Sequence, residues 1–140
     1  MLAVLPTNGW VIPPEIACLK RLTYIGLREN VLKELPPEMG ELPNLHTCVV
    51  DQNDLSQLPP DMGKLQRLVV LSAENNRLTD LPDEISQLPA LRSLSLDGNR
   101  LSAKAQARLR QLLPHTNIDF GRQVGGEEGI GQTIRAPVDN

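Results

Sequence analysis

Aromatic residues, cysteines and long apolar runs are all scarce in this chain of 140 residues. The aromatic fraction is 2%, supplied by Trp10, Tyr24 and Phe120, so we expect an aliphatic core and no base-stacking platform for single-stranded nucleic acid. Two cysteines, Cys18 and Cys48, are too few for a disulfide framework, and they lack the CxxC spacing and nearby histidines of a zinc site. These absences indicate a cytoplasmic protein in a reducing compartment.

Positive charge is not in excess either. The net charge is -3 and the pI is about 5.4, which removes the electrostatic footprint expected of a nucleic-acid or anionic-membrane binder. No apolar run approaches the roughly 18 residues of a membrane helix, and the first ten residues carry no Lys or Arg, which makes a poor secretory signal. Hydrophobic residues make up 40% and charged residues 22%, as in a folded globular chain. We therefore expect one soluble domain that binds neither nucleic acid nor membrane.

A repeat of 23 residues organises most of the chain. At this shift every unit has apolar residues at positions 1, 4, 6 and 11 and an asparagine at position 9. Position 1 holds Leu22, Leu45, Leu68 and Leu91, and position 9 holds Asn30, Asn53, Asn76 and Asn99. The units close with the similar runs LPPEMGEL, LPPDMGKL and LPDEISQL.

These columns resemble the consensus of leucine-rich repeat proteins over about residues 1–120. The closing runs are similar to those of the Ras-binding type and of many small bacterial repeat proteins. The resemblance implies an α/β solenoid, wound as a right-handed superhelix, with short parallel β-strands on the concave face and extended or 3-10 turns on the convex face. It also implies a module that binds other proteins and is not an enzyme.

Elementary chemistry predicts the same architecture. Positions 3 to 6 alternate, so Ile25 and Leu27 point to one side of a short strand while Tyr24 and Gly26 point to the other. The asparagine is predicted to turn the chain out of the strand and to bond loop backbone. Proline at position 15 makes the return path extended. The acid at position 17 suits the start of a short helical turn and has no catalytic role. These acids are Glu15, Glu38, Asp61 and Glu84.

Residues 1–21 are predicted to form a degenerate first unit. A shift of 23 residues places Leu2 and Val4 at positions 4 and 6, and Thr7 where the asparagine would be. Gly9 then takes the leucine place at position 11, with Trp10 beside it. The regular repeats are predicted to span residues 22–101.

Residues 102–120 are predicted to close the solenoid with a helix that Ser102 caps, followed by a last strand one residue out of frame. That strand would bury Ile118 and Phe120. The inward face of the helix is predicted to carry Ala105, Leu109, Leu112 and Leu113, and its solvated face Lys104, Arg108 and Arg110. The Gly-rich residues 121–140 are predicted to be a mobile tail.

No catalytic or metal-binding constellation emerges. Cys48 falls at an inward position and is predicted to be an apolar filler, whereas Cys18 is predicted to be partly buried on the convex side. His46 and His115 are separated by about three units, or roughly 15 Å, so they cannot share a metal ion or a proton. With no phosphate-binding glycine loop, we expect no cofactor.

The strand face opposite the crossovers is predicted to be bare, because every crossover returns on the same side of the sheet. An apolar centre beside an acidic stripe is typical of a protein interface. Stacked acids repel, so a partner with a basic segment would relieve that repulsion. The predicted contact residues are Tyr24, Arg28, Thr47, Val49, Asp51, Val70, Ser72, Glu74, Ser95 and Asp97.

Three functional hypotheses fit these patterns. The favoured one is a monomeric, non-catalytic module that binds a partner protein through the concave sheet. A second is the substrate-recognition portion of a larger effector, as similar repeats serve in bacterial ubiquitin ligases. A third is self-assembly through the exposed edge of the first strand, at Leu2 to Val4.

Overall fold

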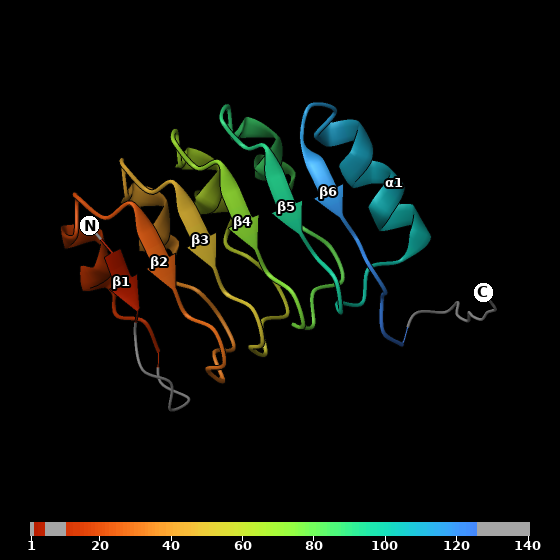
Figure 1. The fold of residues 1–140 in the computed structure, drawn as a ribbon, viewed down its shortest axis with the longest axis horizontal. Coiled ribbons are helices and arrows are strands. Elements are labelled where there is room, and N and C mark those ends of the chain that lie inside the picture. Colours follow the sequence, from red (N-terminus) through yellow and green to blue (C-terminus); the bar gives the residue numbers. More distant parts are fainter. Residues whose placement is uncertain (1, 5–10, 126–140) are drawn as a thin grey trace.

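The computed structural model describes residues 2–4 and 11–125, which form one parallel sheet with the strands in chain order (Figure 1). The strands are β1 (Leu2–Val4), β2 (Tyr24–Gly26), β3 (Thr47–Val49), β4 (Val70–Ser72), β5 (Ser93–Ser95) and β6 (Asn117–Asp119). Between them lie the 3-10 turns η1 (Pro14–Cys18), η2 (Pro37–Glu41), η3 (Pro60–Lys64) and η4 (Asp83–Gln87), and helix α1 (Ala103–Leu112). This order confirms the predicted leucine-rich repeat solenoid.

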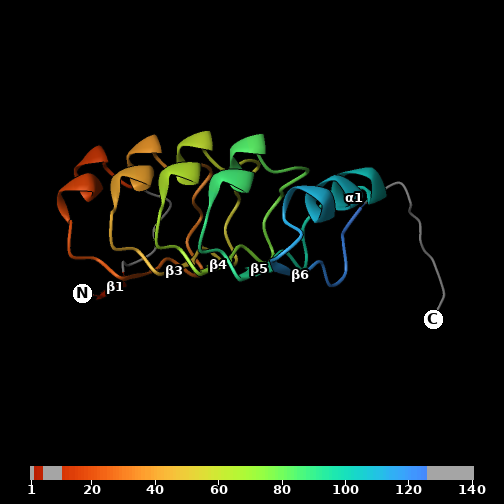
Figure 2. The ribbon, with the colours of Figure 1, turned by 90° about the horizontal axis from the view of Figure 1, so that it is seen from above.

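The described residues form two layers. Figure 2 shows the strands in one layer and the turns and α1 together in the other. The described parts of the crossovers therefore lie on the same side of the sheet, and no described residue forms a second layer on the opposite side, which faces the viewer in Figure 1. We call this side the open face.

The core lies between the two layers and is aliphatic, because the same positions of each unit point inward. Strand positions 4 and 6 are buried in the units that contain β2 to β5, as are the leucines of position 1 in the same units. Position 6, for example, contributes Leu27, Val50, Ala73 and Leu96 to one continuous file. No unit could bury these side chains alone, so each depends on its neighbours for stability.

Buried asparagines tie consecutive units together. Asn53 Nδ2 donates to the carbonyl oxygens of Leu27 (2.9 Å) and Val50 (2.9 Å), and Asn53 Oδ1 accepts from Leu32 N (3.1 Å). Asn76 and Asn99 repeat this pattern one and two units later. The side chain thus satisfies backbone groups that have left the strand ladder, which confirms the predicted structural role.

The 3-10 turns follow the predicted Pro and acid positions. Each turn begins after a proline in extended conformation and has an acid in its first turn. Two glycines in this layer allow close stacking, because a Cβ on Gly40 would lie 2.1 Å from Asp61 O and one on Gly63 would lie 2.5 Å from Glu84 O. No side chain larger than hydrogen fits there without moving the next turn.

Helix α1 closes the stack as predicted, since the Ser102 side chain accepts a hydrogen bond from Ala105 N (3.1 Å) and Ala105 and Leu109 are buried. Arg108 departs from its predicted solvated position. Its guanidinium donates to the side chains of Asp80 and Asp83, and to Leu81 O (3.2 Å). It therefore fastens the helix to the preceding unit.

The last strand is offset by one residue, as predicted, because Ile118 pairs with Leu94 at a shift of 24. The repeat then continues past the predicted boundary at residue 121. Gln123 takes the asparagine role, since its Oε1 accepts from Leu101 N (2.8 Å) and its Nε2 donates to Leu96 O (2.9 Å). Residues 121–125 thus belong to the stack, and the rest of the predicted tail lies outside the described residues.

The predicted register of the first unit is wrong by one residue. Leu2 pairs with Tyr24 and Ala3 with Ile25, so Leu2 and Val4 occupy positions 3 and 5. Turn η1 nevertheless keeps the shift of 23 relative to η2, so the first unit is one residue shorter between Val4 and Pro14. The predicted roles of Thr7, Gly9 and Trp10 lie outside the described residues.

Candidate functional site: the open face of the sheet

The open face carries strand positions 3 and 5 and the residues that follow each strand. Its strand side chains are half-buried, as expected for a sheet surface that no second layer covers. They are Tyr24, Thr47, Val49, Val70, Ser72, Ser93 and Ser95. The structure therefore places the strand members of the predicted contact set on one surface.

An apolar patch occupies strands β2 to β4. The Tyr24 ring lies over Gly26, because a Cβ added to Gly26 would lie 2.9 Å from Tyr24 Cε1 and 3.2 Å from its hydroxyl oxygen. The ring thus covers the backbone that the glycine leaves bare. Val49 pairs with Gly26, and Val70 pairs with Thr47 on the next strand. Tyr24, Val49 and Val70 together form what we call the apolar patch.

The prediction that Asp51 is an exposed member of an acidic stripe is wrong. It is only 3% exposed. Its carboxylate accepts from Ser72 Oγ (2.6 Å) and from Glu74 N (2.8 Å), and it pairs with the Arg28 guanidinium at 3.2 Å. Because its oxygens are already bonded, Asp51 organises the face and is not free to bind a partner.

The remaining acids form an acidic row beside β4 to β6, composed of Glu74, Asp97 and Asp119. Burial raises the pKa of Glu74, and the charges of Asp51, Asp97 and Asp119 raise it further, whereas Arg28 opposes the shift. The predicted repulsion among these acids is therefore present. Asp97 Oδ1 also accepts from Arg122 N (2.6 Å), which fixes that carboxylate.

Asp119 is absent from the predicted contact set. It pairs with Ser95 and thus lies at an outward strand position. The sequence did hold a signal for it, because Ile118 and Phe120 were expected to point inward and the residue between them must then point outward.

Backbone hydrogen bonds continue the ladder beyond the strands. Glu29, Gln52 and Asn75 adopt left-handed φ angles of 63°, 59° and 58° and donate from N to the carbonyls of Asp51, Glu74 and Asp97. Gly98, at φ 78°, occupies the equivalent position in the next unit. The rows of side chains on the open face are therefore held on a continuous hydrogen-bonded backbone, which reduces the entropy lost on binding a partner.

The structure also places the two cysteines and the two histidines. Cys48 is fully buried, and burial raises the pKa of its thiol to about 12, so it is an apolar filler as predicted. Cys18 is exposed, which corrects its predicted partial burial. His46 and His115 lie on the surface as predicted. Among residues 2–4 and 11–125, no group of three or more His, Cys, Asp or Glu residues could hold a metal ion.

A shallow hollow lies at the C-terminal end of the stack, away from the apolar patch. It is lined by Arg110, Leu113, Pro114, Thr116 and Ile118. Arg110 packs over the Phe120 ring, 4.8 Å from its centroid, and shields the end of the core. Within the described part of the chain, no helix is both long and apolar enough to cross a bilayer.

Solved structures similar to this chain share its architecture. A leucine-rich repeat protein of Leptospira interrogans is 35% identical, with a TM-score of 0.64 over 86% of this chain and 37% of that one. An internalin of Listeria monocytogenes is 19% identical, with a TM-score of 0.70 over 95% of this chain and 39% of its own. The plant peptide hormone receptor RGFR1, in complex with RGF2, is 19% identical, with a TM-score of 0.60 over 81% of this chain and 22% of its own.

This chain thus spans less than half the length of these proteins. The comparison with curated proteins gives no match. A family model described as a leucine-rich repeat region matches residues 13–120. This match, together with the stacked units and the asparagine ladder, places the chain in the leucine-rich repeat family.

Proposed function

We propose that this chain is a non-catalytic module that binds a partner protein through the open, concave face of its sheet. Leucine-rich repeat domains are generally protein-interaction modules and typically lack catalytic machinery. The observation that carries the proposal is the apolar patch, a tyrosine ring and two valines on an uncovered, hydrogen-bonded sheet. Aromatic anchors beside a charged rim are what protein interfaces use for affinity and orientation.

The partner contacts are assigned by chemistry. Tyr24, Val49 and Val70 supply apolar area, and the half-buried Thr47, Ser72 and Ser95 around them supply hydroxyls for hydrogen bonds. Glu74 and Asp97 attract a basic segment of the partner, because burial and then the neighbouring acids raise the pKa of Glu74, and a cation placed there relieves the repulsive part. Arg28 is held by Asp51 at the border of the patch.

We place the module in the cytoplasm as a monomer. Cys18 and Cys48 are both free thiols, as is usual in a reducing compartment. The complex of the plant receptor RGFR1 with RGF2 is a precedent for a bound ligand on this fold, although at 19% identity the likeness concerns the fold alone.

The test is affinity capture of partners with the wild-type chain, followed by calorimetric titration of each captured protein. The variant Tyr24→Ala/Val49→Ala/Val70→Ala should weaken binding at least about tenfold, since anchors at an interface centre each contribute about 1–2 kcal/mol. The matched control truncates three valines that lie off the sheet and are 66%, 52% and 51% exposed, Val11, Val31 and Val124. Equal losses in the two variants would contradict the proposal.

The electrostatic part of the proposal has its own test. Glu74→Gln/Asp97→Asn should reduce affinity and flatten its dependence on salt concentration, because surface charges are screened over about 10 Å at 0.1 M. Asp51→Asn is expected to lower stability instead, since it disturbs a buried and fully bonded carboxylate. An unchanged salt dependence in the double variant would remove the acidic row from the interface.

A further inference from the structure

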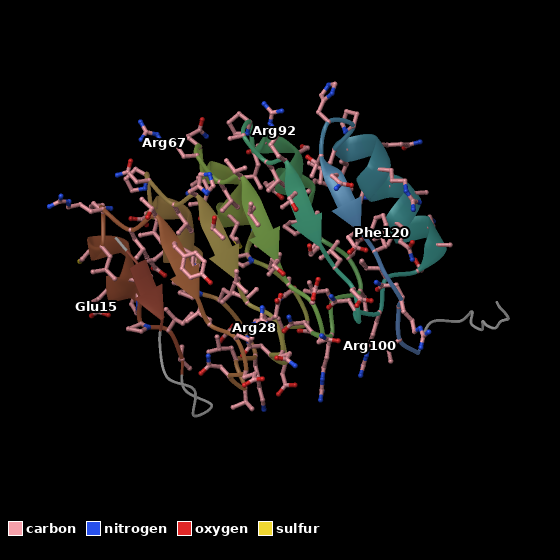
Figure 3. All side chains as sticks on the ribbon, viewed as in Figure 1. Glu15, Arg28, Arg67, Arg92, Arg100 and Phe120 are labelled. Atoms are coloured by element: carbon pink, nitrogen blue, oxygen red, sulfur yellow. The ribbon has the colours of Figure 1, made fainter. Side chains whose placement is uncertain are left out.

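The turns that lead into the strands carry positive charge only. These are residues 19–23, 42–46, 65–69, 88–92 and 113–116, and none of them is Asp or Glu. Their basic residues are Lys20, Arg21, Arg67 and Arg92, with His46 and His115. We call Lys20, Arg67 and Arg92 the basic edge. In Figure 3, Arg67 and Arg92 project from one edge of the sheet, whereas Arg28 and Arg100 lie toward the other.

The positive charge of this edge is not neutralised by the protein itself. Arg67 Nη1 donates to Asn44 Oδ1 (3.0 Å), and Asn44 Nδ2 donates to Lys20 O (2.8 Å), so a neutral amide orients the arginine. Lys20 Nζ donates to the backbone oxygen of Glu41 at 3.3 Å. Within the described residues, no carboxylate lies within 4 Å of the Lys20, Arg67 or Arg92 cations.

Some cations elsewhere on the molecule have carboxylate partners. Arg28 pairs with Asp51, Arg77 with Asp54 at 3.6 Å, and Lys64 with Asp61 at 3.1 Å. The acidic row lies at the other ends of the strands, with Asp119 last in β6 and Glu74 and Asp97 just after β4 and β5. The open face therefore has an electrostatic polarity, with the basic edge before the strands and the repelling acids of the acidic row at their other ends.

We propose that the basic edge binds an acidic segment of a partner protein. Adjacent units are about 5 Å apart. Lys20, Arg67 and Arg92 precede β2, β4 and β5, so an extended segment that runs across the strands can bring different carboxylates to different cations. The site goes beyond the proposed function, which concerns the apolar patch and a basic segment on the acidic row. A partner that engages both edges is fixed in one orientation across the sheet.

An acidic protein segment fits this edge better than a nucleic acid does. Binding to nucleic acid draws its affinity from the neutralisation of many phosphates at once, and this edge provides only a few cations. The described basic edge also offers no aromatic side chain on which a base could stack. A short run of Asp or Glu needs only the few cations present.

The experiment titrates the full chain into a fluorescein-labelled peptide of 12 residues in which Glu and Gly alternate, at low salt, with anisotropy as the readout. Arg67→Glu/Arg92→Glu should raise the Kd about tenfold, because two favourable contacts become repulsive. The matched control, Arg77→Glu/Arg100→Glu, makes the same change in net charge on the other edge and should stay within about twofold. Circular dichroism establishes that both variants are folded.

Three results would overturn the proposal. They are equal losses in both charge-reversal variants, no measurable binding of the peptide by the wild-type chain, and tighter binding of single-stranded oligo-dT than of the peptide. The Tyr24→Ala/Val49→Ala/Val70→Ala variant should bind the peptide with unchanged affinity. Failure of this site is therefore distinguishable from failure of the apolar patch.

Discussion

Replacing Asn76 with alanine tests how the stacked units are held together. Asn76 Oδ1 is the hydrogen-bond acceptor for Leu55 N at 3.1 Å, and Asn76 Nδ2 donates to Val50 O at 3.0 Å and Ala73 O at 3.2 Å. Both carbonyls keep a second donor in the variant, because Asn53 Nδ2 also bonds Val50 O and Asn99 Nδ2 also bonds Ala73 O. The buried Leu55 N–H, in contrast, loses its acceptor.

The magnitude follows from that single orphaned donor. A buried N–H without a partner costs about 1–3 kcal/mol, and loss of the bonds that Asn76 Nδ2 donates to Val50 O and Ala73 O adds about 1 kcal/mol. We therefore expect Asn76→Ala to lower the free energy of unfolding by about 2–4 kcal/mol. This is a large fraction of the stability of a small domain, and a nearly linear stack transmits it to both neighbouring units.

Asn30 provides the comparison inside the same ladder. Its Oδ1 is the one buried side-chain polar atom of the described residues that has no hydrogen-bond partner, and its Nδ2 bonds Leu27 O, which Asn53 also bonds. Asn30→Ala thus orphans no described backbone group and should cost about 1 kcal/mol. Urea unfolding followed by circular dichroism measures both variants. Equal losses, or a loss below about 1 kcal/mol for Asn76→Ala, would refute this reasoning.

Three further predictions concern single groups. An Ellman titration of the native chain at pH 8 should label the exposed Cys18 but not the buried Cys48. Because burial raises the pKa of Cys48 to about 12, the free energy of unfolding should fall as the pH rises from 9 toward 12. Glu74→Gln should stabilise the protein by a few tenths of a kcal/mol at pH 7, and the gain should vanish as acid protonates the wild-type carboxylate, whose pKa is raised. Gly63→Ala should lower the free energy of unfolding by about 1–3 kcal/mol, which calorimetry detects as a lower melting temperature. Ser86→Ala changes the same position of turn η4 and should have little effect.

The repeat columns predicted the fold because each column has one physical task. Apolar positions such as Leu71 recur where the core lies, and asparagines such as Asn53 recur where the backbone leaves the ladder. Deviations within a unit were harder to predict. The first unit is one residue short, and a shift of 23 therefore misplaced Leu2. The role of Gln123 was not predicted, because a glutamine replaces the asparagine there and the repeat shifts from 23 to 24 residues.

The candidate site was predicted in outline from alternation along the strands. Burial of Asp51 could not be predicted in the same way, because its partners, the Ser72 hydroxyl and the Glu74 amide, come from the next unit and depend on the fit between strands. The glycines did leave a signal, since Gly40 and Gly63 fall at the same position of successive units. Their meaning became clear only from the close approach of the following turn.

Mapping the interface in solution would show which surface of the solenoid contacts the partner. The measurement is a comparison of amide NMR spectra of the labelled chain with and without a captured partner. We expect the largest shifts and line broadening on β2 to β4 and the residues that follow them, with the amides of Tyr24, Val49 and Val70 among the most affected. Shifts confined to the turns η1 to η4 and helix α1, with the open face unchanged, would contradict this expectation.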